Sequence, residues 1–91
     1  MAGRLFRIHG SVQGVFYRAW AIGEAQALGL TGWVRNRSDG TVELAAWGSD
    51  EALDALLVRC RQGPPEARVE RIETAEAEGE APADFRKAPT V

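Results

Sequence analysis

The run His9-Gly10-Ser11-Val12-Gln13-Gly14-Val15-Phe16-Tyr17-Arg18 contains the residue types in this chain that are best suited to binding an anion. Its two glycines allow a tightly folded loop, because glycine adopts backbone angles that residues with a Cβ avoid. The loop leads from a predicted strand into a predicted helix, whose first N–H groups have no partners within the helix. Unpaired amides and the helix dipole both favour negative charge. Arg18 adds a guanidinium that can bind two phosphate oxygens, so the run predicts a phosphate-binding loop.

The glycine spacing alone leaves two interpretations of this loop. Gly10 and Gly14 are not followed by the Gly-Lys-Ser/Thr of a Walker A loop, and the third glycine of a dinucleotide fingerprint is missing. The run could therefore be a plain connection between a strand and a helix. Further motifs are needed to choose between a connection and a phosphate site.

Hydrophobic periodicity predicts the elements that position this loop. In chain order they are a strand over 4–9, a helix over 18–28, strands over 32–37 and 41–47 joined by a turn at 38–40, a helix that follows Ser49 or Asp50 and ends at Gly63, and a strand over 67–75. Val69 and Ile72 are out of phase in the last of these strands, which predicts a bulge between them. A short extra C-terminal strand can form around Phe85, where Lys87 would suit an exposed sheet edge. The β-α-β-β-α-β order predicts an α+β fold, a ferredoxin-like sandwich with two helices on one face of an antiparallel sheet.

Composition limits the classes of function that this chain can have. Its single cysteine, Cys60, forms no internal disulfide and predicts a reducing compartment. No apolar run reaches transmembrane length and the N-terminus lacks the hydrophobic region of a signal peptide, so we expect a cytoplasmic protein without a membrane partner. One histidine, His9, and one cysteine do not make a metal site, so we expect no metal. Residues 1–48 hold five arginines against three carboxylates, an excess that suits a small anionic substrate but not a nucleic acid.

Three motifs in order resemble those of the acylphosphatase family. They are Gly10-Ser11-Val12-Gln13-Gly14-Val15-Phe16-Tyr17-Arg18, Leu28-Gly29-Leu30-Thr31-Gly32-Trp33-Val34-Arg35-Asn36 and Asp39-Gly40-Thr41-Val42-Glu43. The resemblance covers nearly the whole chain and implies a single domain over residues 1–91 with the same ferredoxin-like fold. It implies an enzyme that hydrolyses the carboxyl–phosphate bond of acyl phosphates to a carboxylate and inorganic phosphate, without a metal or cofactor. One departure from the family pattern is Lys87, which stands where an apolar residue usually follows the final Phe.

The resemblance also implies a role for individual residues. Arg18 matches the arginine that binds the phosphate, and Asn36 matches the asparagine that holds the attacking water. Backbone amides of the loop would bind the remaining phosphate oxygens; the expected loop residues are Gln13, Gly14, Val15, Phe16, Tyr17 and Arg18. This small set of groups is sufficient for the reaction, because a carboxylate leaving group departs without a general acid. Its conjugate acid has a pKa of about 4. An amide both donates and accepts, so Asn36 can orient water without changing its own charge.

Two alternative functions use the same features. The loop could belong to a module that binds a phosphate ligand, or that binds or hydrolyses carbamoyl phosphate, as in domains of larger proteins that resemble this family. RNA-recognition domains share the topology and stack bases on aromatic residues of the open sheet face. The outward residues of the first and third strands include one aromatic residue, Trp47, and among them Glu43 repels phosphate. We therefore expect no nucleic-acid partner, and we expect a monomer.

Overall fold

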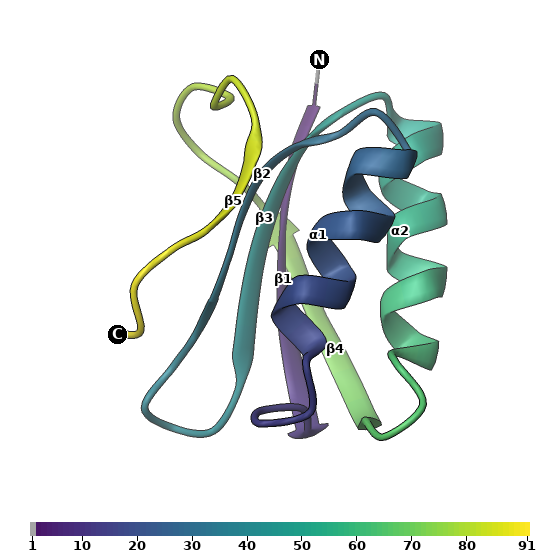
Figure 1. The fold of residues 1–91 in the computed structure, drawn as a ribbon. Helices are drawn as coiled ribbons and strands as arrows, with labels where there is room; N and C mark the ends of the chain where they lie inside the picture. Colours follow the sequence, from purple (N-terminus) through teal and green to yellow (C-terminus); the bar gives the residue numbers. More distant parts are fainter. Residues whose placement is uncertain (1) are drawn as a thin grey trace.

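The computed structural model describes residues 2–91, which form a five-stranded sheet with both helices on one face (Figure 1). In chain order the elements are β1 (Ala2–Ser11), α1 (Tyr17–Ala27), β2 (Thr31–Asn36), β3 (Val42–Gly48), α2 (Asp50–Gln62), β4 (Arg68–Glu76) and β5 (Phe85–Lys87). The strand order across the sheet is β4-β1-β3-β2-β5, and β1 to β4 pair in antiparallel fashion. The predicted α+β sandwich and its order of elements are confirmed.

The last strand makes the sheet mixed rather than antiparallel. β5 forms the expected extra edge strand, but it pairs in parallel with β2, with Phe85 opposite Gly32 and Lys87 opposite Val34. The prediction of an antiparallel sheet is therefore wrong at this edge. The segment 77–84 carries the chain from β4, at one edge of the sheet, to the other edge beside β2, so β5 does not form a hairpin with β4. Periodicity within a three-residue strand gives no information about its direction.

Alternation along the strands places one face of the sheet against the helices. The fully buried side chains are Phe6, Ile8, Val34, Val42, Leu44 and Ala46 from the strands and Ala21, Ala25, Leu53, Leu56 and Cys60 from the helices. Leu57, the residue after Leu56 on α2, is only partly buried. Burial of apolar surface is the main stabilising term in a domain of this kind. It holds α1 against β2 and β5, so the N-terminus of α1 faces the end of β2.

The end of β1 differs from the prediction because Gly10 belongs to the strand. β1 continues through Ser11 and stays paired with β4 across a register shift, and the predicted bulge between Val69 and Ile72 is confirmed. Gly10 has a φ of 131°, and a Cβ there would lie 2.0 Å from the Arg68 carbonyl oxygen. This glycine therefore permits the close approach of β4, and the loop that leads to α1 begins only after the strand.

The turn between β2 and β3 fixes the end of β2. Oδ1 of Asp39 accepts hydrogen bonds from the Thr41 backbone N at 3.0 Å and from the Thr41 hydroxyl at 2.6 Å. These two bonds hold the pKa of the Asp39 carboxyl below its usual value. Arg37 N donates to the Thr41 carbonyl oxygen at 2.9 Å, which closes the hairpin. The predicted turn is confirmed, and it places Asn36 at the last paired position of β2.

Candidate active site

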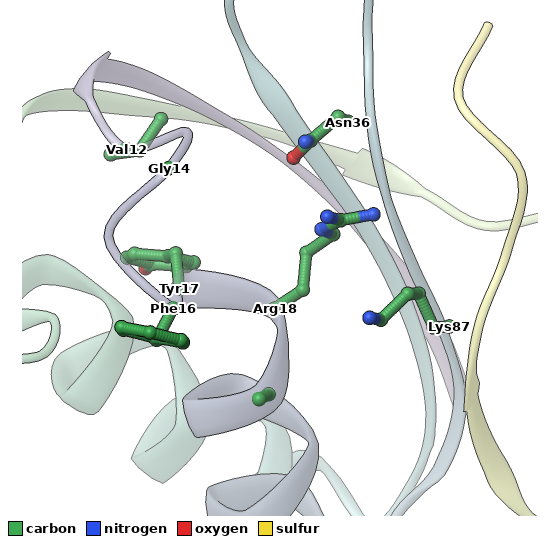
Figure 2. A pocket seen from close by; sticks show the side chains of 8 residues that line it. Val12, Gly14, Phe16, Tyr17, Arg18, Asn36 and Lys87 are labelled. Carbon is green, nitrogen blue, oxygen red and sulfur yellow. The ribbon is translucent and has the colours of Figure 1, made fainter.

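A cavity of 270 Å³ opens between the N-terminus of α1 and the end of β2 (Figure 2). It is lined by Val12, Gly14, Phe16, Tyr17, Arg18, Ala19, Asn36 and Lys87. Sites for drug-sized ligands usually measure about 300–1,000 Å³, so this cavity suits a smaller substrate. The two predicted catalytic residues, Arg18 and Asn36, meet here although they come from different elements.

The loop between β1 and α1 ends in two left-handed backbone conformations. Gly14 has a φ of 74°, and Phe16, the N-cap residue of α1, has a φ of 63°. Such a conformation costs a residue with a Cβ about 1–2 kcal/mol, so the surrounding structure must hold Phe16 in it. Within residues 2–91, none of the backbone N–H groups from Gly14 to Ala19 donates a hydrogen bond to the protein. The loop therefore offers a row of free donors at a helix N-terminus, where an anion is favoured.

Gln13 anchors this loop to the turn between β2 and β3. Its side-chain nitrogen donates to the carbonyl oxygens of Arg37, at 2.7 Å, and of Thr41, at 2.9 Å. The Val15 side chain packs against the hydrophobic core. Two of the six predicted loop residues are thus outside the cavity lining, whereas the other four line it: Gly14, Phe16, Tyr17 and Arg18. The anchor joins the loop to the hairpin whose first strand ends in the catalytic candidate Asn36.

Tyr17 supports the site from the core. Its side chain is 1% exposed and its hydroxyl donates to the Cys60 carbonyl oxygen at 2.6 Å, which joins the first turn of α1 to α2. Burial raises the pKa of Tyr17 and raises that of the Cys60 thiol to about 12. Both groups therefore stay protonated at neutral pH and have a structural role, not an acid–base one.

Arg18 extends from the first turn of α1 toward Asn36 (Figure 2). No carboxylate of residues 2–91 forms an ion pair with its guanidinium. In contrast, Arg35 on the open sheet face is 2.6 Å from a carboxylate oxygen of Glu43. The Arg18 guanidinium is thus available to an anionic ligand in the cavity.

Asn36 presents a hydrogen-bond acceptor that the protein leaves free. Its Oδ1 atom is buried and has no hydrogen-bond partner among residues 2–91. The backbone around it is held from two sides, because Asn36 pairs with Val42 of β3 and its carbonyl oxygen accepts from Val91 N at 3.2 Å. A buried acceptor without a partner costs about 1–3 kcal/mol, and a bound water would remove that cost. The geometry fits the water-holding role expected for this residue.

Lys87 is a cavity residue that sequence reasoning missed. As expected, it is an exposed residue of the edge strand β5, and alternation along β5 also puts it on the same face as the buried Phe85, two residues earlier. Its ammonium group is directed toward Arg18 (Figure 2). The spacing from Phe85 was the available signal, and it became informative only once β5 was seen beside β2.

The open face of the sheet is more enclosed than expected. Glu43 is only 5% exposed, and it accepts hydrogen bonds from Arg35 at 2.7 Å and from Arg37 at 3.2 Å. Arg35 also lies over the Trp33 ring, 4.6 Å from its centroid. Glu43 is therefore a buried ion-pair partner and not the exposed repelling charge assumed above. The absence of a nucleic-acid partner stays a prediction.

Two further findings concern the part of the chain that the structure describes. Residues 2–91 contain no group of three or more His, Cys, Asp or Glu side chains arranged to hold a metal ion. None of the helices in this range is long and apolar enough to cross a membrane.

The family model described as Acylphosphatase matches residues 5–87. The chain belongs to the acylphosphatase family. An acylphosphatase of Azorhizobium caulinodans is 56% identical over 85 residues, which cover 92% of this chain and 91% of that protein. The structure of an acylphosphatase from Coxiella burnetii has a TM-score of 0.91 at 38% identity and covers 96% of this chain and 92% of that one. The crystal structure of acylphosphatase from Bacillus subtilis has a TM-score of 0.86 at 33% identity, over 100% of this chain and 99% of that one.

These comparisons confirm the family that the three sequence motifs indicated. The protein is an acylphosphatase, a hydrolase whose substrate is a small-molecule acyl phosphate. The cavity between α1 and β2 is the candidate site of this hydrolysis.

Proposed function

We propose that Arg18 and the loop amides hold the phosphoryl group of the acyl phosphate while Asn36 positions the water that attacks phosphorus. The observation that carries the proposal is the meeting of two unsatisfied groups in one cavity. These are a guanidinium without an ion pair and a buried amide oxygen without a hydrogen bond, both within residues 2–91.

The residues act by positioning and by electrostatic stabilisation. As a bond forms between the water oxygen and phosphorus, the bond from phosphorus to the acyl oxygen breaks, and its electron pair leaves with the carboxylate. A water proton passes to a phosphate oxygen. Charge spreads over the three equatorial oxygens during the transfer. The Arg18 fork and the free amides of residues 14–19 are already oriented in the folded state, so they stabilise that charge without reorganisation.

The donor set of the cavity supports a mechanism without general acid–base catalysis and without a metal. The residues that line it include no carboxylate, imidazole or thiol side chain. The carboxylate leaves unaided because its conjugate acid is strong, with a pKa of about 4. The reaction therefore needs only an anion site and an oriented water.

We also propose that the protein works as a cytoplasmic monomer with a single domain over residues 1–91. The lone cysteine supports a reducing compartment, because a chain with one thiol forms no internal disulfide. The monomeric state stays a prediction that sedimentation can test.

The test is hydrolysis of benzoyl phosphate, followed by ultraviolet absorbance with a chelator present. We expect Arg18→Gln to lower kcat/KM by about 10²–10³-fold, the usual effect of removing one preorganised donor. The matched control is Arg61→Gln, which removes an exposed arginine of α2 that has no ion pair within residues 2–91. Circular dichroism checks that both variants fold. Arg18→Gln turnover within about threefold of the wild type would overturn the mechanism.

A further inference from the structure

We infer that Lys87 makes this enzyme selective for acyl phosphates whose acyl group carries a second negative charge. The inference rests on the proposed function, because it assumes that the phosphoryl group lies between the loop and Arg18. It adds a specificity-determining residue on β5, a strand that contributes none of the residues expected at the site.

Figure 2 shows the loop around Gly14 and the side chain of Lys87 on opposite sides of Arg18. A phosphoryl group bound to the loop amides and the guanidinium lies on the loop side. Lys87 therefore faces the part of a substrate that extends beyond the phosphoryl group, which is its acyl portion.

The backbone on which Lys87 lies is attached to β2. Residues on both sides of it are hydrogen-bonded to β2: Ala88 N donates to the Val34 carbonyl oxygen at 2.8 Å, and Gly32 N donates to the Asp84 carbonyl oxygen at 2.9 Å. The backbone that carries the ammonium is therefore fixed relative to the cavity, and only the side chain can move.

No carboxylate of residues 2–91 forms an ion pair with Lys87, whereas its neighbour Arg86 is paired with Asp84 at 3.0 Å. The proposed function assigns Arg18 and the free amides to the phosphoryl group, which leaves Lys87 as the remaining cation that lines the cavity. An uncharged acyl group offers nothing to the remaining cation, but a carboxylate or second phosphate on the acyl group does.

The test measures binding with analogues that cannot be hydrolysed, in which a methylene replaces the bridging oxygen. Phenacylphosphonates with a carboxylate at the 3- or 4-position of the ring are compared by calorimetry with their carbamoyl counterparts, which are similar in size but uncharged. We expect the wild type to bind a carboxylate analogue about fivefold more tightly, the upper range for an exposed ion pair. Lys87→Met should abolish this preference, Lys87→Glu should reverse it and Lys87→Arg should keep it.

Arg86→Met is the matched control, because it removes a cation from the same strand on the opposite face. It should leave the preference unchanged. Lys87→Met that weakens both analogues equally would show that Lys87 acts on the phosphoryl group, and that result overturns the inference. A preference that survives in Lys87→Met overturns it too, as does a wild type that binds neither analogue.

Turnover is measured separately so that the two proposals can fail independently. A wild type that shows the Lys87-dependent preference but does not hydrolyse benzoyl phosphate keeps the selectivity and refutes the proposed function. Hydrolysis that depends on Arg18, with equal binding of charged and uncharged analogues, keeps the function and refutes the selectivity.

Discussion

Asn36→Leu should separate the catalytic contribution of this residue from its contribution to stability. Leucine has nearly the shape of asparagine but neither donates nor accepts hydrogen bonds. A residue kept for structure loses stability when its polar group is removed. A residue kept for catalysis loses activity instead, and it can become more stable.

The magnitude of the stability effect follows from the free Oδ1 of Asn36, which is buried without a partner in residues 2–91. Leaving a buried acceptor unsatisfied costs about 1–3 kcal/mol, and any water bound there offsets part of that cost. Its removal should therefore change the free energy of unfolding by between zero and about +1 kcal/mol. In a domain of this size, 1 kcal/mol corresponds to a rise in Tm of about 4–8 °C. Activity should fall by about 10²-fold, because the attacking water loses its orienting group.

Thermal unfolding, followed by circular dichroism, gives Tm, and hydrolysis of benzoyl phosphate gives kcat/KM for the same preparation. Gln26→Leu is the control, since it replaces an exposed amide of α1 outside the cavity lining. It should leave kcat/KM unchanged. A fall in Tm of more than about 8 °C in Asn36→Leu would refute the reasoning, because the amide would then be part of the structural framework. Full activity in Asn36→Leu would refute the assigned role in orienting water.

Two other expectations concern the framework and the chemistry of the site. Gly10→Ala should lower the free energy of unfolding by about 2–5 kcal/mol in urea denaturation, because the new Cβ meets the Arg68 carbonyl oxygen in a strained backbone. Gly23→Ala, at an exposed helical position with open space around it, should raise the free energy of unfolding by about 0.5–1 kcal/mol. A Gly10→Ala variant more stable than Gly23→Ala would contradict both expectations. The pH profile of kcat should be flat from about pH 5.5 to 8, because the cavity lining has no histidine or carboxyl side chain. A bell-shaped profile would reveal an acid–base pair that the structure does not show.

The sequence by itself determined the main elements, and it predicted Arg18 and Asn36 as site residues. Strand alternation and helical spacing depend on which local positions are apolar, so the core residues Phe6, Ile8, Leu53 and Leu56 could be predicted without tertiary information. The three motifs indicated the family, and the resemblance implied the roles expected for Arg18 and Asn36. Motifs of this kind are readable because loop shape and the first turn of a helix depend on neighbouring residues.

Tertiary structure decided the features that depend on pairing between distant segments. Gly10 is required by the close approach of β4. From the loop sequence alone, this glycine was explained by the folding of the loop. Gln13 was expected to bind phosphate through its backbone amide, and only the tertiary structure shows that its side chain donates to the carbonyl oxygens of Arg37 and Thr41.

The direction of β5 shows the same limit most clearly. Three residues with one buried Phe85 are compatible with either a parallel or an antiparallel neighbour. Only the contact with β2 across the sheet places Lys87 beside Arg18. Local sequence determines which side of a strand a residue faces, whereas long-range hydrogen bonding determines what it faces, and the cavity depends on both.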